Sequence, residues 1–168
     1  MNEHIIGCEL QLPYPPVKTD GKNLYYASLL TNDFGGVVSE MSTSLAYVFQ
    51  SFVTANTKVS DTIKCIALVE MRHLGLIGEL INAYGGNPRY AVQSGSKCNF
   101  WNAQYIGYET NPKLYLKENI VNEKASIANY NIRINQISDR SVHDLLARII
   151  LDEENHVNIL NGLLEEFY

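Results

Sequence analysis

Two Glu-x-x-His motifs, Glu70-Met-Arg-His73 and Glu153-Glu-Asn-His156, constrain this chain more than any other feature. Each motif lies in a stretch where apolar residues recur at alternating spacings of three and four, as on one face of an amphipathic helix. Residues three positions apart on a helix point to the same side, so each motif presents a carboxylate and an imidazole together. Two such motifs predict a site that holds two metal ions.

The apolar seam around each motif is the reason to expect a metal, because in both seams Glu and His are the only polar members. The first seam consists of Val59, Ile63, Ile66, Glu70, His73, Ile77, Leu80 and Tyr84. The second consists of Val142, Leu146, Ile149, Glu153, His156, Leu160, Leu163 and Phe167. A buried ionised carboxylate loses much of its hydration energy unless a cation or hydrogen bonds replace it. The alternative, a salt-bridged polar cluster without metal, would leave charge uncompensated.

Two further acids complete the predicted ligand set, because a dinuclear site in a four-helix bundle takes one Glu from each of the other two helices. Glu123 is the only charged member of the seam in the 116–137 stretch. Glu40 is the most central acid of a more polar seam in the 24–54 stretch, where a solvated acid near a pocket mouth is the alternative. We predict Glu40 and Glu123 as bridging carboxylates, with Glu118 as the rival to Glu123. The terminal or partly bridging ligands are then Glu70, His73, Glu153 and His156.

An extended arm and a long helix are predicted for the first third of the chain. Residues 1–22 contain three prolines and are expected to form the arm. The first helix is predicted over 23–55 with Gly35-Gly36 inside it, where each glycine costs about 1 kcal/mol relative to alanine. These glycines are expected to allow a close helix approach or to leave room beside the metals.

Capping and helix-stopping residues mark three more helices. The second helix is predicted to start at Ser60 or Asp61 and to stop at Gly85-Gly86. The third is predicted from Asn111-Pro112 to Ile137, and the fourth from the 138–141 turn to the C-terminus. The aromatic 85–112 segment is too long for a tight turn and is expected to cross the length of the bundle. These links predict an all-α four-helix bundle over 23–168, made of two antiparallel helical hairpins joined by a crossover.

At this point the chain resembles the ferritin-like di-metal carboxylate superfamily, whose successive helices carry Glu, Glu-x-x-His, Glu and Glu-x-x-His. The segments that resemble its rubrerythrin-like and manganese-catalase-like branch are Val69-Glu70-Met71-Arg72-His73-Leu74, Gly85-Gly86-Asn87-Pro88-Arg89-Tyr90, Phe100-Trp101 and Glu123-Lys124-Ala125-Ser126-Ile127. The chain departs from rubrerythrins because it lacks a four-cysteine rubredoxin and has Ser126 where they place a second carboxylate. These departures disfavour rubrerythrin-type peroxidase chemistry and leave a four-Glu, two-His site.

Three residues are predicted to surround the ligands. Asp152 resembles the superfamily's aspartate that holds the histidine of the second helix, so we expect Asp152 to contact His73. Tyr47 and Tyr130 each lie one heptad beyond a predicted bridging carboxylate. Both are expected to flank the metals as hydrogen-bond donors or redox-active phenols, and ordinary core aromatics are the alternative.

Composition and charge exclude several classes of function. The 168 residues suit one domain, and the net charge of −5 without a basic run argues against a nucleic-acid partner. The N-terminus lacks the pattern of a secretory signal, and no apolar run approaches the length of a membrane span. We therefore expect a cytoplasmic protein without a membrane partner, with a spore coat or another assembly as an open alternative.

The cysteines and the remaining histidines are not predicted to take part in the chemistry. Cys8, Cys65 and Cys98 are odd in number and form no C-x-x-C pair, which indicates neither a disulfide framework nor a zinc or rubredoxin-like iron site. Cys65 is expected to be a small buried hydrophobe, and His4 and His143 are expected on the surface. Any electrons for a reduction would come from outside the chain.

The predicted ligands favour a di-metal oxidoreductase, because carboxylates with imidazoles suit two iron or two manganese ions per chain. With manganese it would resemble a catalase that disproportionates hydrogen peroxide in oxidative-stress defence. With iron it would act on peroxide or O2 as a peroxidase or ferroxidase that needs an external electron donor. The alternatives are a ferritin-like metal-storage or coat protein with little turnover and, less favoured, an oxidase of an organic substrate. The aromatic crossover and proline-rich arm also predict a homo-oligomer.

Overall fold

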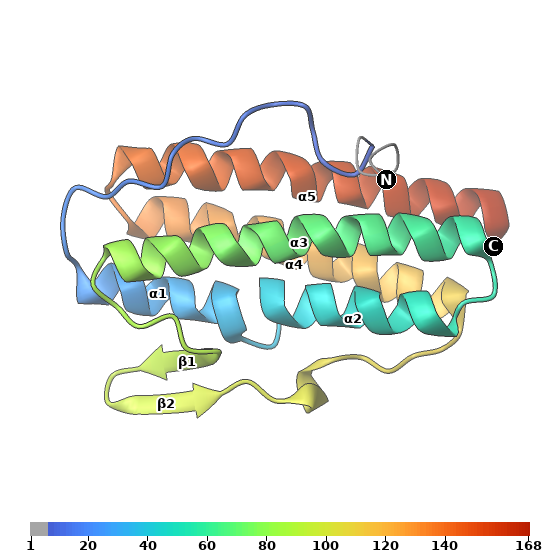
Figure 1. The fold of residues 1–168 in the computed structure, drawn as a ribbon, viewed down its shortest axis with the longest axis horizontal. Helices are drawn as coiled ribbons and strands as arrows, with labels where there is room; N and C mark the ends of the chain where they lie inside the picture. Colours follow the sequence, from blue (N-terminus) through green and yellow to red (C-terminus); the bar gives the residue numbers. More distant parts are fainter. Residues whose placement is uncertain (1–6) are drawn as a thin grey trace.

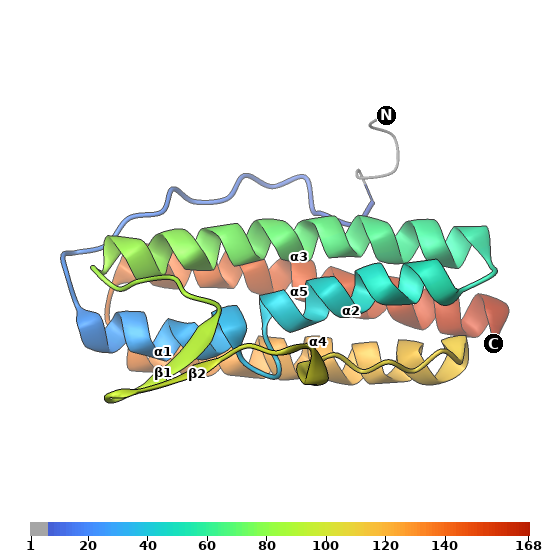
Figure 2. The same cartoon turned by 60° about the horizontal axis from the view of Figure 1, so that its bottom comes forward.

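The computed structural model describes residues 7–168, which form a helical bundle with a small hairpin on one side (Figures 1 and 2). The helices are α1 (Leu24–Gly35), α2 (Glu40–Val53), α3 (Thr57–Ala83), α4 (Pro112–Gln136) and α5 (Arg140–Phe167). Helices α1 and α2 follow one another along a single edge of the bundle, so that together they fill one of its four positions (Figure 2). Short links join α2 to α3 and α4 to α5, and the long segment between α3 and α4 runs along the bundle (Figure 1). This is the predicted four-helix arrangement. None of the described helices is long and apolar enough to cross a membrane.

Polar side chains set where the helices begin. The carboxamide oxygen of Asn56 accepts a hydrogen bond from the backbone N–H of Val59, so α3 starts before the predicted caps Ser60 and Asp61. An N-cap side chain satisfies a backbone donor that the first helical turn leaves without a partner. At α5 the predicted turn supplies the cap, because Asp139 accepts from the N–H of Ser141.

The prediction of one continuous helix over 23–55 is wrong, because the chain leaves the helical path at residues 36–39. Gly36 is the C-cap of α1, and Ser39 caps the start of α2 by accepting from the N–H of Ser42. Gly35 meets the hairpin so closely that a Cβ there would lie 2.8 Å from the backbone nitrogen of Ala91. Low helix propensity, a local cap and this close approach together end α1.

The crossover is ordered and packs on the bundle. It contains an antiparallel hairpin of β1 (Ala91–Ser94) and β2 (Lys97–Phe100), followed by the short 3₁₀ helix η1 (Ala103–Tyr105), none of which the sequence pattern predicted. The aromatic rings of Phe34 and Tyr90 stack with their centroids 5.4 Å apart, which fixes the hairpin against α1. Farther along, the indole N–H of Trp101 donates to the hydroxyl of Ser42 at 3.0 Å, which ties the crossover to α2.

The N-terminal segment over residues 7–22 lies along the outside of α3 and α5 (Figure 1). The Arg148 guanidinium donates to the carbonyls of Leu10 and Leu12, at 2.8 and 3.0 Å. Cys8 and Cys65 form a disulfide, so the expectation of no disulfide and of Cys65 as a simple buried hydrophobe is wrong. The odd cysteine count hid this pair because Cys98 is the one left over. The first residues of the arm, with His4, lie outside the described residues.

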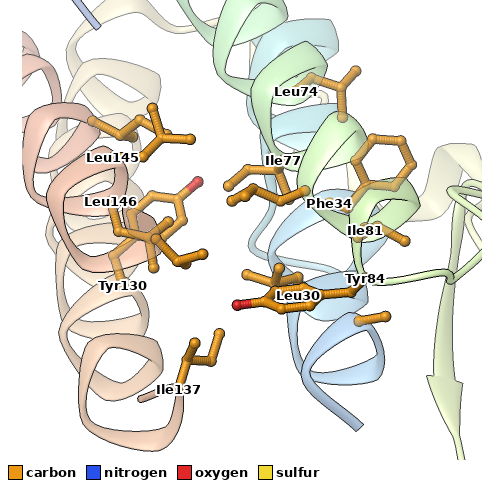
Figure 3. Packing of buried hydrophobic residues seen from close by; sticks show 14 residues of the cluster. Leu30, Phe34, Leu74, Ile77, Ile81, Tyr84, Tyr130, Ile137, Leu145 and Leu146 are labelled. Carbon is orange, nitrogen blue, oxygen red and sulfur yellow. The ribbon is translucent and has the colours of Figure 1, made fainter. Parts of the chain in front are cut away.

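Two apolar clusters fill the bundle on either side of its centre. One of them includes Leu30, Ile77, Tyr84 and Leu146, whose side chains meet between α1, α3 and α5 (Figure 3). The other includes Ile63, Ile66, Tyr115, Leu116 and Leu160. Since both Glu-x-x-His motifs lie between these positions in sequence, their polar side chains occupy the layer between the two clusters. The core therefore shields this layer from water at both ends.

Replacing Ile77 by Ala should lower the free energy of unfolding of the metal-free protein by about 2–5 kcal/mol, because Ile77 is fully buried and a cavity would remain. Urea unfolding followed by circular dichroism measures the change. The control is Leu68→Ala on the same helix, where the side chain is 57% exposed and a change within about 0.5 kcal/mol is expected. Equal losses in the two variants would contradict the packing described.

Candidate metal centre

Six buried side chains from four helices converge at the centre of the bundle. They are Glu40 on α2, Glu70 and His73 on α3, Glu123 on α4, and Glu153 and His156 on α5. None of the six is more than 2% exposed. The structure thus brings together every residue predicted as a metal ligand, whereas the rival Glu118 lies exposed on the outside of α4.

The six side chains form two overlapping groups, each with one histidine. One group consists of Glu40, Glu70, His73 and Glu153, and the other of Glu70, Glu123, Glu153 and His156. Within each group, one donor atom per residue lies within 4.8 Å of all the others. Two carboxylates, Glu70 and Glu153, belong to both groups, which is the position of a bridging ligand. Glu40 and Glu123, which the sequence predicts as bridging carboxylates, belong to one group each, a position that favours a terminal role. The partly bridging role predicted for Glu70 and Glu153 fits their place in both groups.

The motif carboxylates lie between the groups because α3 and α5 face one another with their motifs at the same level. Each histidine therefore approaches the carboxylate of the opposite motif. The Nδ1 atom of His73 lies 2.9 Å from Glu153 Oε1, and the Nδ1 atom of His156 lies 2.8 Å from Glu70 Oε1. Both Nδ1 atoms thus point into the cluster, and both Nε2 atoms point outward.

Several inward-facing atoms lack a hydrogen bond of good geometry. They are Glu40 Oε2, Glu70 Oε1, His73 Nδ1, Glu123 Oε2 and Glu153 Oε1. Buried polar groups are almost always hydrogen-bonded, so a concentration of such atoms at one point indicates a missing partner. Carboxylate oxygens with one imidazole in each group suit a pair of iron or manganese ions. The residues present therefore fit a dinuclear metal site.

Two tyrosines hold the carboxylates that belong to one group only. The hydroxyl of Tyr47 on α2 donates to Glu123 Oε1 on α4, and the hydroxyl of Tyr130 on α4 donates to Glu40 Oε1 on α2. Both tyrosines are 1% exposed. The exchange is reciprocal, so α2 and α4 are linked twice across the centre. Both phenols thus touch candidate ligands, and neither is a purely apolar core aromatic.

The outward nitrogens of the histidines have different partners. His73 Nε2 lies 3.3 Å from Asp152 Oδ2, the contact expected from the sequence, and 3.1 Å from the Tyr14 hydroxyl oxygen. His156 Nε2 donates to the backbone carbonyl of Cys8 at 3.1 Å. Such outer hydrogen bonds fix the tautomer and orientation of a metal-binding imidazole. One histidine therefore faces an anionic partner and the other faces a neutral carbonyl.

The N-terminal segment supplies two of these outer partners, and sequence reasoning missed both. The Tyr14 hydroxyl donates to Asp152 Oδ2 at 2.5 Å, and the Arg148 guanidinium lies 2.6 Å from the same oxygen. Burial favours a higher pKa for Asp152, but hydrogen bonds from His73, Tyr14 and the Leu10 N–H outweigh it and lower the pKa to about 2. No periodic pattern in the arm marked Tyr14 or Cys8, because an extended segment has no helical seam.

Two further titratable residues, Asp33 and His143, lie away from the cluster. Asp33, a member of the same seam as Glu40, pairs with Arg133 at 2.6 Å and is part of neither group. His143 is partly buried, and its ring bonds to the Ile137 carbonyl, a partner that the sequence did not indicate.

Charge in the cluster is balanced by protons when no metal is bound. Burial and repulsion from Glu153 raise the pKa of Glu70 to about 7 and also raise the pKa of Glu123. Burial opposes a charge on His73 and His156, but the neighbouring carboxylates outweigh it and raise the pKa of both imidazoles. Metal binding must displace these protons, so metal affinity is expected to increase with pH.

The metal-free protein should lose stability as the pH rises from about 5 to about 8. A carboxyl with a raised pKa binds more protons when folded, and its stabilising effect is lost between its ordinary value of 4.5 and, for Glu70, about 7. The raised histidines act in the same direction, because their contribution is complete below their ordinary pKa of 6.5 and is lost above it. Urea unfolding at a series of pH values measures this slope.

Glu70→Gln should make the free energy of unfolding of the metal-free protein depend less steeply on pH, because the amide does not titrate. Stability of the metal-free protein that rises with pH over this range would contradict the charge balance described.

Glu123→Ala should reduce the metal content of the purified protein by more than half, because it removes a buried carboxylate from one of the two groups. Glu118→Ala, the same change on the exposed face of α4, should leave the metal content unchanged. Inductively coupled plasma mass spectrometry measures the moles of metal bound per mole of chain. A larger loss in the Glu118 variant would show that the ligand on α4 is misassigned.

Comparison with known proteins places this geometry in a family context. A family model described as manganese-containing catalase matches residues 8–89. A Clostridium acetobutylicum protein described as a probable manganese catalase is 26% identical, over 89% of this chain and 73% of the relative. The uncharacterized protein YjqC of Bacillus subtilis is 25% identical, over 94% of this chain and 67% of the relative.

Two solved structures are similar to this chain over most of its length. The manganese catalase KatB from Anabaena is 26% identical and superposes with a TM-score of 0.85, over 94% of this chain and 79% of KatB. Rhodobacter capsulatus bacterioferritin, at 18% identity, has a TM-score of 0.69 over 88% of each chain and shows the likeness of fold alone.

Proposed function

We propose that this chain, which belongs to the ferritin-like di-metal carboxylate superfamily, holds two manganese ions and converts hydrogen peroxide into water and O2. The observation that carries the proposal is the pair of carboxylates, Glu70 and Glu153, that both four-residue groups share. Shared carboxylates keep two ions close enough to exchange two electrons with one substrate molecule. The manganese catalases among the similar proteins favour manganese over iron.

The reaction needs no electron donor outside the substrate. One hydrogen peroxide gives up two electrons and two protons to become O2, and a second takes up both to become two waters. When bound by these ligands, two manganese ions that change between the +2 and +3 states would store the two electrons between the half-reactions. A reaction without an outside donor also needs no pair of free thiols to pass electrons to the site. Among the described residues, Cys8 and Cys65 are already paired and Cys98 is the remaining thiol.

The protein's own groups hold the ligands in place. Burial, together with the neighbouring carboxylates, raises the pKa of Tyr47 and Tyr130, so both phenols stay protonated and keep donating to Glu123 and Glu40. Asp152 stays ionised because its pKa is low, and it orients the imidazole of His73. These contacts pre-organise the oxygen and nitrogen donors before a metal arrives.

The surrounding core keeps bulk water from the site. Apolar side chains lie on both sides of the carboxylate layer, with Ile77 and Ile149 on one side and Ile66 and Leu160 on the other. All four are fully buried. A dry site strengthens the interaction between carboxylates and cations and limits the release of reactive products.

Protein purified without added metal should contain two manganese ions per chain and release one O2 for every two molecules of hydrogen peroxide consumed. Metal analysis and an oxygen electrode measure the two quantities. Glu153→Gln removes one of the two shared carboxylates and should abolish O2 release. The control is Glu154→Gln, the same change at the neighbouring exposed residue, which should leave O2 release unchanged.

Two iron ions per chain, with peroxide consumed only in the presence of a reductant, would favour a peroxidase instead. A full manganese complement without O2 release would overturn the catalase proposal. The cytoplasmic location and the homo-oligomer expected from the sequence stay predictions.

A further inference from the structure

The side chain of Tyr14 reaches the candidate metal centre from outside the bundle. It belongs to the N-terminal segment that lies along α3 and α5 (Figure 1). Its hydroxyl oxygen lies 3.1 Å from His73 Nε2, and its proton is donated to Asp152 Oδ2 at 2.5 Å. The direct distance from His73 Nε2 to Asp152 Oδ2 is longer, at 3.3 Å. The phenol is therefore the nearer of the two partners of this imidazole.

Two guanidinium groups hold the ring of Tyr14 in place. Those of Arg72 on α3 and Arg148 on α5 lie 4.5 and 4.3 Å from the centroid of the ring. A cation within about 6 Å of an aromatic ring is attracted by its π electrons. Arg72 is itself fixed by Glu9, 2.7 Å away, and Arg148 donates to two backbone carbonyls of the same N-terminal segment. Tyr14 is thus tied to the two helices that carry the Glu-x-x-His motifs.

The direction of the hydrogen bonds follows from the side of the imidazole that faces the cluster. His73 Nδ1 points inward, so a metal-bound imidazole keeps its proton on Nε2. This N–H can donate to the phenol oxygen, because the proton of the phenol goes to Asp152. Arg148 lies 2.6 Å from the same aspartate oxygen and favours its ionised form. A chain of two hydrogen bonds therefore joins His73 to a negative charge.

His156 lacks such a chain. Its Nε2 donates to the backbone carbonyl of Cys8 at 3.1 Å, which is a neutral partner. Within residues 7–168, no side chain forms a hydrogen bond with this nitrogen. The two four-residue groups contain the same types of donor, one imidazole and three carboxylates each. They differ in what lies behind the histidine.

We propose that Tyr14 is a positioning residue that acts through His73, and that it makes the metal position on the His73 side the firmer of the two. A hydrogen bond toward an anion fixes the orientation of an imidazole and makes it a stronger electron donor to a metal. Removal of such an outer partner typically costs about 10- to 100-fold in metal affinity. The effect of Tyr14 falls on one ion, since its hydroxyl contacts one histidine. The inference rests on the dinuclear centre of the proposed function and not on the reaction that the metals perform.

Manganese binding to single-histidine variants of the metal-free, full-length protein tests this assignment. His156→Ala leaves the group of His73 intact, and His73→Ala leaves the group of His156 intact. Competition with a fluorescent chelator measures the dissociation constant of the remaining Mn(II). The ion in His156→Ala should bind about tenfold more tightly than the ion in His73→Ala. A tighter ion in His73→Ala would overturn the inference.

Tyr14→Phe, added to each of these variants, separates the hydroxyl from the packing, because phenylalanine keeps a ring beside the two arginines. It should weaken Mn(II) binding by about tenfold or more in His156→Ala and by less than about twofold in His73→Ala. The matched control is Tyr25→Phe, the same change at an exposed tyrosine of α1, which should alter neither dissociation constant by more than about twofold. Equal weakening in both backgrounds, or an unchanged constant in His156→Ala, would overturn the role of Tyr14.

Metal release from the doubly loaded protein gives a second measurement, which holds even if a single-histidine variant fails to fold. In an excess of the fluorescent chelator, the wild type should release its two manganese ions in two kinetic phases. Tyr14→Phe should accelerate the slower phase by about tenfold and leave the faster phase within about twofold of the wild type. A single phase in the wild type, or equal acceleration of both phases, would contradict the proposal.

The proposed function fails in a different way. Manganese bound with this difference between the two positions, but without O2 release, would overturn the catalase activity alone. O2 release together with equal effects of Tyr14→Phe in both backgrounds would overturn the role of Tyr14 alone. A wild-type chain that binds no manganese would overturn both.

Discussion

The burial of four carboxylates in one layer of a helix bundle is the constraint on which the rest of this structure depends. Four acids in two overlapping groups, with donor atoms within 4.8 Å of one another inside each group, are unstable in an apolar core unless positive charge lies among them. Protons on the cluster supply part of that charge without metal, and two divalent ions would supply all of it. The tyrosines and the N-terminal segment then fix the direction in which each ligand points.

The two metal positions have similar inner ligands but different surroundings. Each group has one histidine, one tyrosine-bound carboxylate and the two shared carboxylates. Beyond them, His73 meets an ionised aspartate and His156 meets a backbone carbonyl. The N-terminal segment, which the Cys8–Cys65 disulfide ties to α3, contacts both of these groups: Tyr14 donates to Asp152, and the carbonyl is that of Cys8 itself. A segment outside the bundle therefore helps to orient both histidines. The break between α1 and α2 similarly links the fold to the site, because it seats the hairpin and lies directly before Glu40.

The sequence determined the candidate ligands and the helix that carries each one. A buried acid stands out in an apolar seam, and the three-residue spacing within each motif fixes a shared face whatever the neighbouring helices do. This is why Glu70, His73, Glu153 and His156 could be named from two short motifs. Glu123 could be separated from Glu118 because only Glu123 lies in its seam. The order of short and long links then predicted the bundle topology.

Tertiary structure decided the features that depend on contacts between distant segments. The roles of the shared and terminal carboxylates follow from how closely α3 faces α5, which periodicity within one helix cannot reveal. The helix break depends in part on the hairpin that packs on Gly35, in addition to the local glycine and serine caps. The Cys8–Cys65 disulfide and the contact of Tyr14 with Asp152 join an arm without periodicity to α3 and α5. Local sequence patterns report which face of an element is buried, and only the assembled fold determines what that face meets.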